Sequence, residues 1–593
     1  MITSILLALA VSGGAASAPA YRVDLTRYFP SPAAEAEQRA GLMAEVDRFA
    51  ADAARPVDSP AGLLALLTTD DRLRRRLRLH ELHAHLRAAS DTGDHAAAAA
   101  DDALGAAEDR LDTARARALR QAGRPALERF LAADPALAPW RALVESDLRV
   151  APSALANEQA IAVLARPALD SLANAYGDLR RAVLASARAA SAPSEPAAFV
   201  HARWAPWQVN GPAFAALLVP SATIQDGQAR LEGVADAAAA AYARQGLTRE
   251  QVHDVLAAVR ASPAWADYTT LVAGVTARRL GVASERLAPW QLDPEGEWRA
   301  PPTPFPDALR QIVAAERTVG PTYAAQFERL LDPANARVDW CRGPTCDDTG
   351  FSVGAPGATS ALFYGAYGGD VDGVRAVAHE AAHAVHRQFM SEHQPIAAYQ
   401  SGPKFMFESF AIFNELVVLD HLQRGAATRQ ARIGLLRAFI EDAVRQVFGS
   451  ARETALEEAL HADIQAGRAR TAAAFDARTL AVFADYTPPL QRFDDGRAFW
   501  ARNRLYFIDP FYDTNYLFAG LLALAYLRQF EQDPRDFERR YVALLSNGFD
   551  APPRELLQRF MRIDLADGAG LVRDATAAIT ARTAALAQLY ESP

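Results

Sequence analysis

The sequence predicts a mainly α-helical protein with one short strand ahead of its most informative helix. From Ala33 to Arg188 the chain is rich in Ala, Leu and Arg, and apolar residues recur at helical spacing between breaks at Pro or Asp. The same spacing returns from Val374 to Phe389, where Asp372-Gly373 offers an N-cap. A further run from Lys404 to Leu416 is almost wholly apolar, which is typical of a buried helix.

The first residues have the features of a secretory signal peptide. An apolar stretch from Ile5 to Val11 precedes Ala16-Ser17-Ala18, which fits a small-x-small cleavage site, although no Lys or Arg comes before the apolar stretch. We therefore expect residues 1–18 to be removed and the mature protein to be exported, either periplasmic or secreted.

Composition restricts the partners and the organisation of the chain. The net charge of −9 and the pI near 5.8 argue against nucleic acid as a partner. No internal run reaches about 18 uninterrupted apolar residues, so no membrane span is expected after signal removal. The Pro-rich break from Ala300 to Pro306 is the expected boundary between an N-terminal helical lobe, 19–300, and a second lobe, 301–593.

The motif His379-Glu380-Ala381-Ala382-His383 is typical of a metal site. Its four-residue spacing places two imidazoles on one face of a helix, where they can share a tetrahedral Zn²⁺. Glu380 lies between them and can act as a general base toward a zinc-activated water. Such a motif also arises by chance on solvated helix faces, so the neighbouring sequence is needed to distinguish a metal site from a surface helix.

The apolar run from Lys404 to Leu416 offers the missing ligand. Glu408 and Glu415 are seven residues apart, nearly two helical turns, so both face the same way. A carboxylate in such a run is costly to bury unless a metal or a proton donor compensates it. We therefore expect Glu408 to complete a site for one Zn²⁺ per chain with His379 and His383. Glu415 is then the natural partner to orient a ligand imidazole.

Other histidines have different expected roles. His386 lies on the ligand face one turn beyond His383, and we expect it to contact substrate or to support a ligand, since a catalytic zinc keeps one position open. The remaining histidines in a polar helical region among Arg and Ala are expected at the surface: His80, His83, His85 and His95.

The stretch Val377–His386 followed by Glu408–Glu415 resembles the oligoendopeptidase F branch of the thimet oligopeptidase family of zinc metallopeptidases. That family pairs a His-Glu-x-x-His-x-x-His helix with a Glu about 25 to 30 residues later, which opens a Glu-x-x-x-x-Phe-Asn-Glu run. The spacing here is 29 residues, and Ala381-Ala382 replaces the usual Leu-Gly or Phe-Gly.

The resemblance implies zinc on His379, His383 and Glu408, with Glu380 as the general base. It also implies a multi-helix gluzincin-type fold with a deep substrate channel and a small β-sheet near the zinc helix. In this arrangement 19–300 is the helical lobe that roofs the channel, and the second lobe is catalytic and binds zinc. Its substrates are short, unstructured peptides.

The segment Tyr506–Tyr516 is similar to the family's C-terminal His-Phe-Tyr-x-x-Phe-Tyr-x-Tyr-x-Tyr segment, in which phenols hydrogen-bond the oxyanion of the tetrahedral intermediate. The resemblance implies this role for Tyr512 and Tyr516, which lie four residues apart on one face of a helix. Tyr506 replaces the family's His, and Thr514 replaces its middle Tyr. Tyr506 is therefore expected only to contact substrate or to support the site, and each of these tyrosines has a core position as its alternative.

A Gly-rich stretch from Gly343 to Gly373 precedes the zinc helix. The run Leu362–Tyr364 is interpreted as an edge strand that binds a peptide by strand addition, with an ordinary connecting loop as the alternative. The only cysteines, Cys341 and Cys346, are expected to form a local disulfide after export. A two-cysteine metal site is disfavoured because no second pair accompanies it.

The combined interpretation is an exported zinc-dependent metallopeptidase that hydrolyses short unstructured peptides. The alternative is a non-catalytic zinc-containing peptide-binding protein of the same fold, which lost turnover through Tyr506 and Thr514. The intact Glu380 favours the enzyme, because a binding protein needs no general base. The sequence leaves open the peptide preference, endopeptidase or carboxydipeptidase action and the oligomeric state.

Overall fold

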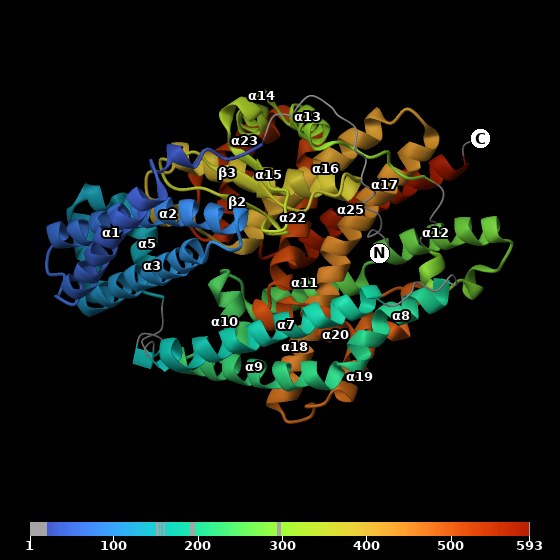
Figure 1. Ribbon diagram of the computed structural model, residues 1–593, viewed down its shortest axis with the longest axis horizontal. Coiled ribbons are helices and arrows are strands. Elements are labelled where there is room, and N and C mark those ends of the chain that lie inside the picture. The colour runs from blue at the N-terminus through green and yellow to red at the C-terminus, as the bar shows by residue number, and fades with distance from the viewer. Residues whose placement is uncertain are drawn as a thin grey trace.

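The computed structural model confirms a mainly α-helical chain with one small sheet (Figure 1). The structure describes residues 21–149, 153, 156–157, 160–189, 196–292 and 298–591. The expected signal peptide, residues 1–18, lies outside these residues, so its assignment stays a prediction. No helix in the described ranges is both long and apolar enough to cross a membrane.

The first five helices form an N-terminal bundle, drawn in blue in Figure 1. Two of them begin at Ser-Pro pairs, where the Ser31 and Ser59 hydroxyls accept hydrogen bonds from backbone N–H groups of the first turn. The bounds of these helices are α1 Pro32–Asp52, α2 Pro60–Ser90, α3 His95–Ala122, α4 Arg124–Ala133 and α5 Arg141–Asp147.

Two histidines of α2, His80 and His83, are buried, so the prediction that they lie at the surface is wrong for them. His85 of the same helix is partly exposed, and His95 of α3 is exposed. His80 and His83 are 3% and 1% exposed, and the ring of Phe29 lies 4.5 and 5.2 Å from theirs. The Nδ1 atom of His80 lies 2.8 Å from a carboxylate oxygen of Glu35 on α1. The polar composition of α2 predicted an exposed helix, but this helix packs against α1, α3 and the segment after α15.

A second group of helices packs around the buried Trp500 and Phe507. It brings together helices that are far apart in the sequence, drawn in green and orange at the bottom of Figure 1. Their bounds are α7 Arg166–Ala189, α8 Pro196–Val209, α9 Gly211–Leu231, α18 Ser450–Gln465, α19 Ala472–Tyr486, α20 Phe499–Arg502 and α21 Leu505–Ile508.

The largest hydrophobic core contains residues from both sides of the Pro-rich break, from Ala237 to Val272 and from Phe305 to Leu586. The division into lobes at residue 300 stays a prediction, and this core joins the two parts. Its helices are α10 Ala237–Arg244, α11 Arg249–Ala261, α12 Ala264–Leu280, α13 Phe305–Glu316, α14 Pro321–Leu331, α15 Val371–His393, α16 Lys404–Gly425, α17 Arg429–Val444, α22 Asp513–Gln532, α23 Pro534–Asn547, α24 Pro553–Leu556 and α25 Gly568–Glu591.

Three strands form a sheet beside α15: β1 Val338–Trp340, β2 Gly350–Val353 and β3 Ala361–Tyr364. Their order is β1-β3-β2, with β3 parallel to β1 and antiparallel to β2. The run Leu362–Tyr364 is therefore a strand, but its expected position at the edge is wrong. All four residues of β3 are buried, which is typical of a central strand, and β2 takes an edge.

The disulfide expected between Cys341 and Cys346 is present just after β1, with the two Cα atoms 5.8 Å apart. Cys341 packs with Phe363 of β3 and with Leu82 and Leu86 of α2. The bridge therefore lies where the sheet contacts the N-terminal bundle.

The two helices of the expected metal site begin in different ways. Asp370 caps α15 by accepting a hydrogen bond from the Gly373 N–H at 2.7 Å, so the N-cap lies two residues before the expected position. Pro403 precedes α16 and provides no side-chain cap. The helix α16 is buried among α13, α15, α17 and α22, which explains its apolar sequence.

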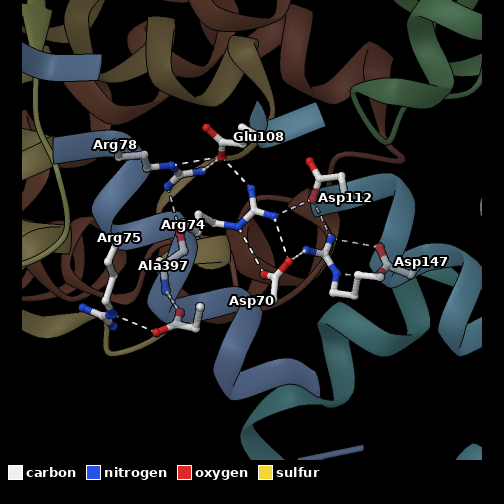
Figure 2. A network of polar contacts seen from close by, with 10 residues as sticks. Asp70, Arg74, Arg75, Arg78, Glu108, Asp112, Asp147 and Ala397 are labelled. Carbon is white, nitrogen blue, oxygen red and sulfur yellow. Dashed lines mark hydrogen bonds and ion pairs between the residues drawn. The ribbon is translucent and has the colours of Figure 1, made fainter. Parts of the chain in front are cut away.

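A network of charged side chains fixes the N-terminal bundle to the connection between α15 and α16 (Figure 2). Arg74 on α2 lies 2.6 Å from Glu108 and 2.7 Å from Asp112 on α3. One turn later, Arg78 donates hydrogen bonds to Glu108 and, at 2.8 Å, to the carbonyl oxygen of Ala397. The connection between α15 and α16 is therefore held in part by contacts with α2.

Candidate metal centre

The side chains of His379, His383 and Glu408 meet at one point between α15 and α16. The two Nε2 atoms are 3.2 Å apart, and Glu408 Oε2 lies 3.3 Å from His379 Nε2 and 3.7 Å from His383 Nε2. Among the described residues, they are the one group of three potential ligands whose donor atoms all lie within 4.8 Å of one another.

These three side chains fit a tetrahedral metal ion. Two ligands that each lie about 2.0–2.1 Å from a tetrahedral Zn²⁺ are about 3.3 Å apart, close to the three separations in this cluster. Glu408 is only 7% exposed, and its Oε2 atom has no hydrogen-bond donor among the described residues. A buried carboxylate oxygen of this kind needs a cation. Two imidazoles and one carboxylate are also a usual ligand set for catalytic zinc.

Glu415 lies behind His379, on the side away from the other two ligand atoms. Its Oε1 atom is 2.6 Å from His379 Nδ1, which directs the Nε2 atom toward His383 and Glu408. Arg375 contacts the second oxygen of Glu415 and lies 3.3 Å from Asp442. Burial raises the pKa of the Glu415 carboxyl, but Arg375 and His379 outweigh it and lower this pKa to about 2. Glu415 is therefore ionised when it accepts the imidazole N–H.

Glu380 is partly exposed on the face of α15 that carries His379 and His383. It forms no hydrogen bond or ion pair with the described residues, so its carboxylate is free to accept a proton. The space beside it is narrow, because a Cβ atom added to Gly350 of β2 would lie 3.2 Å from Glu380 Cγ. The edge strand therefore passes directly over this side chain.

Tyr512 and Tyr516 approach the cluster from the start of α22. The Tyr512 hydroxyl donates a 2.6 Å hydrogen bond to Glu408 Oε1, the carboxylate oxygen that faces away from the imidazoles. The two phenol rings are 5.1 Å apart, edge to face. Burial raises the pKa of both hydroxyls, and the charge of Glu408 raises each further, so both are protonated donors at neutral pH.

The chain turns at Phe511, just before Tyr512. Its φ of 64° lies in the left-handed region, which is strained for a residue with a branched or bulky side chain. The Phe511 N–H donates a 2.9 Å hydrogen bond to Glu457 on α18, and its ring lies 4.7 Å from that of His461 and 6.0 Å from that of Tyr242. These contacts hold the strained turn and so direct Tyr512 toward Glu408.

The structure does not bring His386 and Tyr506 into the cluster. His386 is 1% exposed, and its ring packs 4.8 Å from Phe407 and 4.6 Å from Phe410. Tyr506 is also buried, and its hydroxyl donates a 2.8 Å hydrogen bond to the carbonyl oxygen of Glu453. Thr514 is buried with its hydroxyl 3.4 Å from that of Thr454. Tyr506 and Thr514, the two positions that differ from the family's C-terminal segment, therefore lie in packed regions of the protein.

Three residues that shape this site were not predicted from the sequence: Arg375, Arg387 and Phe511. Arg375 and Arg387 flank the ligand histidines at helical spacing, four residues before His379 and four after His383, which is a signal that the sequence contains. The backbone conformation of Phe511 was not predictable, because residue type indicates a positive φ only for Gly and, less often, for Asn or Asp.

The comparisons with known proteins agree with this geometry. Residues 370–571, about a third of the chain, match the sequence profile of peptidase family M3. No curated protein sequence matches the chain significantly. The expected resemblance to the oligoendopeptidase F branch of this family is confirmed.

Solved structures show the same fold over nearly the whole chain. A candidate peptidase from Chlamydophila abortus is 18% identical with a TM-score of 0.75, and the match covers 97% of this chain and 99% of that one. Oligoendopeptidase F from Enterococcus faecium is 15% identical with a TM-score of 0.63, over 93% and 98% of the two chains. PZ peptidase A, solved with an inhibitor, is 16% identical with a TM-score of 0.69, over 92% and 96%. At these identities the likeness concerns the fold, and the family match adds support for a metallopeptidase.

Proposed function

We propose that this chain, which resembles the oligoendopeptidase F branch of peptidase family M3, is a zinc-dependent metallopeptidase that hydrolyses short unstructured peptides. The observation that carries the proposal is the convergence of His379, His383 and Glu408 at tetrahedral ligand spacing, with the free carboxylate of Glu380 on the same helix face. One zinc ion per chain, bound there, would polarise the scissile carbonyl and make a water molecule more acidic.

The chain's own residues provide the proton transfers and the orientation. Glu380 accepts the proton of the attacking water and later returns it to the leaving amine. Glu415 fixes the tautomer of His379, because an ionised carboxylate accepts the Nδ1–H and leaves Nε2 unprotonated for the metal. Tyr512, with Tyr516 beside it, provides phenol donors on the opposite side of Glu408 from the imidazoles.

The non-catalytic alternative has less support from the geometry. It rested on Tyr506 and Thr514, whose side chains are buried and satisfied by contacts with α18. Tyr512 keeps its hydroxyl at the cluster despite both replacements. A zinc-binding module would also have no use for a free carboxylate at Glu380.

We also propose that the protein is exported and that its substrates are limited in length. The disulfide between Cys341 and Cys346 supports an oxidising compartment, in agreement with the signal peptide predicted at residues 1–18. Restriction to peptides of about 5 to 20 residues follows if helices of the N-terminal part roof the site, because a folded protein cannot present an extended segment inside a narrow cleft.

The test is metal analysis combined with a cleavage assay. The purified protein should contain about one zinc per chain and cut a quenched fluorescent peptide of about ten residues. A chelator should abolish cleavage, and added zinc should restore it, whereas a stable folded protein should stay intact. A protein that binds zinc and peptide without any cleavage would support the non-catalytic alternative instead.

A further inference from the structure

Arg387 lies on the face of α15 that carries the candidate metal ligands. It follows His383 by four residues, so it lies about one turn, or about 6 Å, further along the helix on nearly the same stripe. The side chain is partly exposed, like those of His379 and His383. A guanidinium group therefore stands beside the place where the proposed substrate would be cleaved.

Three neighbours hold this side chain in place. Its Nε–H donates a 3.3 Å hydrogen bond to the Ser352 hydroxyl of β2, and its Cζ atom lies 5.6 Å from the centroid of the Phe407 ring. A Cβ atom at Gly354 would lie 2.9 Å from Arg387 Cβ, so only glycine leaves room for the arginine stem there. A guanidinium held in this way loses little conformational freedom when it binds a ligand.

The positive charge of Arg387 has no counter-charge in contact with it. Among the described residues, no carboxylate lies within the 4.0 Å distance of an ion pair, and neither Nη nitrogen donates a hydrogen bond to the chain. Burial and the like charge of Arg78 lower the pKa of Arg387, whereas Glu81 and Glu380 raise it from a greater distance. Arg375, in contrast, is paired with Glu415 and Asp442.

The edge strand connects this arginine with the proposed base. Alternate residues of β2 face α15: Gly350 lies over Glu380, and Ser352 contacts Arg387. Glu380 and Arg387 are seven residues apart on the helix, which is about 10 Å or about three residues of an extended peptide. A peptide that adds to the outer edge of β2 would pass both side chains.

We propose that Arg387 is a specificity-determining residue that binds a carboxylate of the peptide substrate, two to three residues from the scissile bond. This inference rests on the proposed function of the same site. The two free Nη groups would form a charge-assisted, bidentate contact that neutralises the unpaired guanidinium. A peptide antiparallel to β2 would offer an acidic side chain before the scissile bond, and a parallel one would offer its C-terminal carboxylate.

A peptide series identifies the source of the carboxylate. One neutral peptide is varied by moving a single Asp through the three positions on each side of the cleaved bond, each with an Asn counterpart. A further pair carries a free or an amidated C-terminus. With the zinc-loaded enzyme, one carboxylate should raise kcat/KM by about 10- to 100-fold, mainly through KM, because a hydrogen-bonded charge pair contributes on this scale.

Substitutions of Arg387 test whether this preference for a carboxylate depends on that residue. In Arg387→Gln the favoured acid and its neutral counterpart should differ by less than about threefold, while the zinc content stays at about one per chain. Arg387→Lys should restore part of the preference, and it serves for the comparison if the Gln variant does not fold. Arg424→Gln, the same change at an exposed site about 24 Å along α16 from Glu408, should keep the full preference.

The outcomes separate this inference from the proposed function. Cleavage without any carboxylate preference, or a preference that survives Arg387→Gln, would refute the role of Arg387 and leave the peptidase intact. If zinc-loaded wild type cleaves nothing, the proposed function fails, and binding of the same fluorescent peptides decides the inference. Affinity that depends on the carboxylate and is lost in Arg387→Gln would support it, whereas equal affinities would overturn it.

Discussion

The Tyr512 hydroxyl donates a hydrogen bond of 2.6 Å to Oε1 of Glu408, while Oε2 of the same carboxylate faces the two imidazoles. One carboxylate thus joins the start of α22 to the ligand helix α15. The tail segment therefore contacts a proposed metal ligand directly, and a change in Tyr512 can alter both metal binding and turnover.

Removing one ligand should remove the metal. His379→Ala, His383→Ala and Glu408→Ala should each lose zinc and activity, because two remaining ligands cannot retain the ion at ordinary concentrations. Inductively coupled plasma mass spectrometry of the purified variants measures the zinc content. His393→Ala, at the end of the same helix and hydrogen-bonded to the Phe389 carbonyl, should keep one zinc per chain. Full zinc occupancy in Glu408→Ala would show that the third ligand is misassigned.

Glu380→Gln should separate metal binding from chemistry. The amide keeps the size of the side chain but cannot accept the proton, so zinc should remain while kcat falls by about 10²–10⁴-fold or more. Steady-state kinetics on a quenched peptide, with zinc content measured on the same sample, checks this. Glu392→Gln on the same helix is the control and should leave kcat unchanged. A Glu380→Gln enzyme with the wild-type kcat would rule out the proposed base.

Tyr512→Phe should affect metal retention and turnover together. Loss of the hydrogen bond to Glu408 should weaken zinc binding by about 10-fold in a chelator competition, which is typical of removing a group that supports a ligand. At saturating zinc, kcat should still fall by about 10²-fold with KM little changed, if the phenol also stabilises the oxyanion. Tyr516→Phe should leave zinc affinity unchanged, because its hydroxyl makes no hydrogen bond to the described residues. Normal kcat in both variants and in the double variant would exclude the phenols from the mechanism.

Glu457 should act on catalysis only through Tyr512. Burial raises the pKa of Glu457 well above its usual range. Glu457→Gln keeps an oxygen that can accept the Phe511 N–H, so this variant should behave like the wild type. Glu457→Leu removes the acceptor, so the strained turn at Phe511 should relax and kcat should fall by about 10-fold.

A double-variant cycle tests this dependence. In the Tyr512→Phe background, Glu457→Leu should change kcat by less than about twofold, because the phenol that it positions is already absent. Equal effects in both backgrounds would mean that Glu457 influences the site by another route.

The spacing of residues in the sequence was sufficient to predict that the side chains of His379, His383 and Glu408 come together. The four-residue spacing of His379 and His383, and the seven-residue spacing of Glu408 and Glu415, predict which side chains share a helix face, because a helix converts spacing into direction. The start of α15 was misplaced by two residues, since Asp370 and Asp372 are equally good caps by type.

Features that depend on distant contacts were not predictable. The central position of β3 depends on β1 and β2, which are three and four residues long and too short to give a periodic signal. Tyr506 aligns with a site residue of the family, but a carbonyl oxygen on α18 binds its hydroxyl. The burial of His83 depends on Phe29 and on packing against α1, which its polar neighbours in the sequence do not reveal.

His83 should make the protein less stable as the pH falls from about 6.5 to about 4. Burial lowers the pKa of His83 to about 4, and the charges of Arg87 and His80 add to this against the opposing charge of Glu35. An unfolded histidine titrates near pH 6.5. Between these values the unfolded chain binds a proton that the folded chain does not, so the free energy of unfolding increases with pH across this window. The loss on acidification reaches about 3 kcal/mol from this residue.

Urea unfolding of the wild type and His83→Gln at pH 7 and pH 4.5 measures this contribution. The neutral amide does not titrate, so the difference in stability between the two pH values should be smaller in His83→Gln by about 2–3 kcal/mol. His95→Gln, at an exposed position at the start of α3, is the control and should keep the wild-type pH dependence. Identical pH dependence in the wild type and His83→Gln would mean that His83 is accessible to protons in the folded state, contrary to its burial beside Phe29.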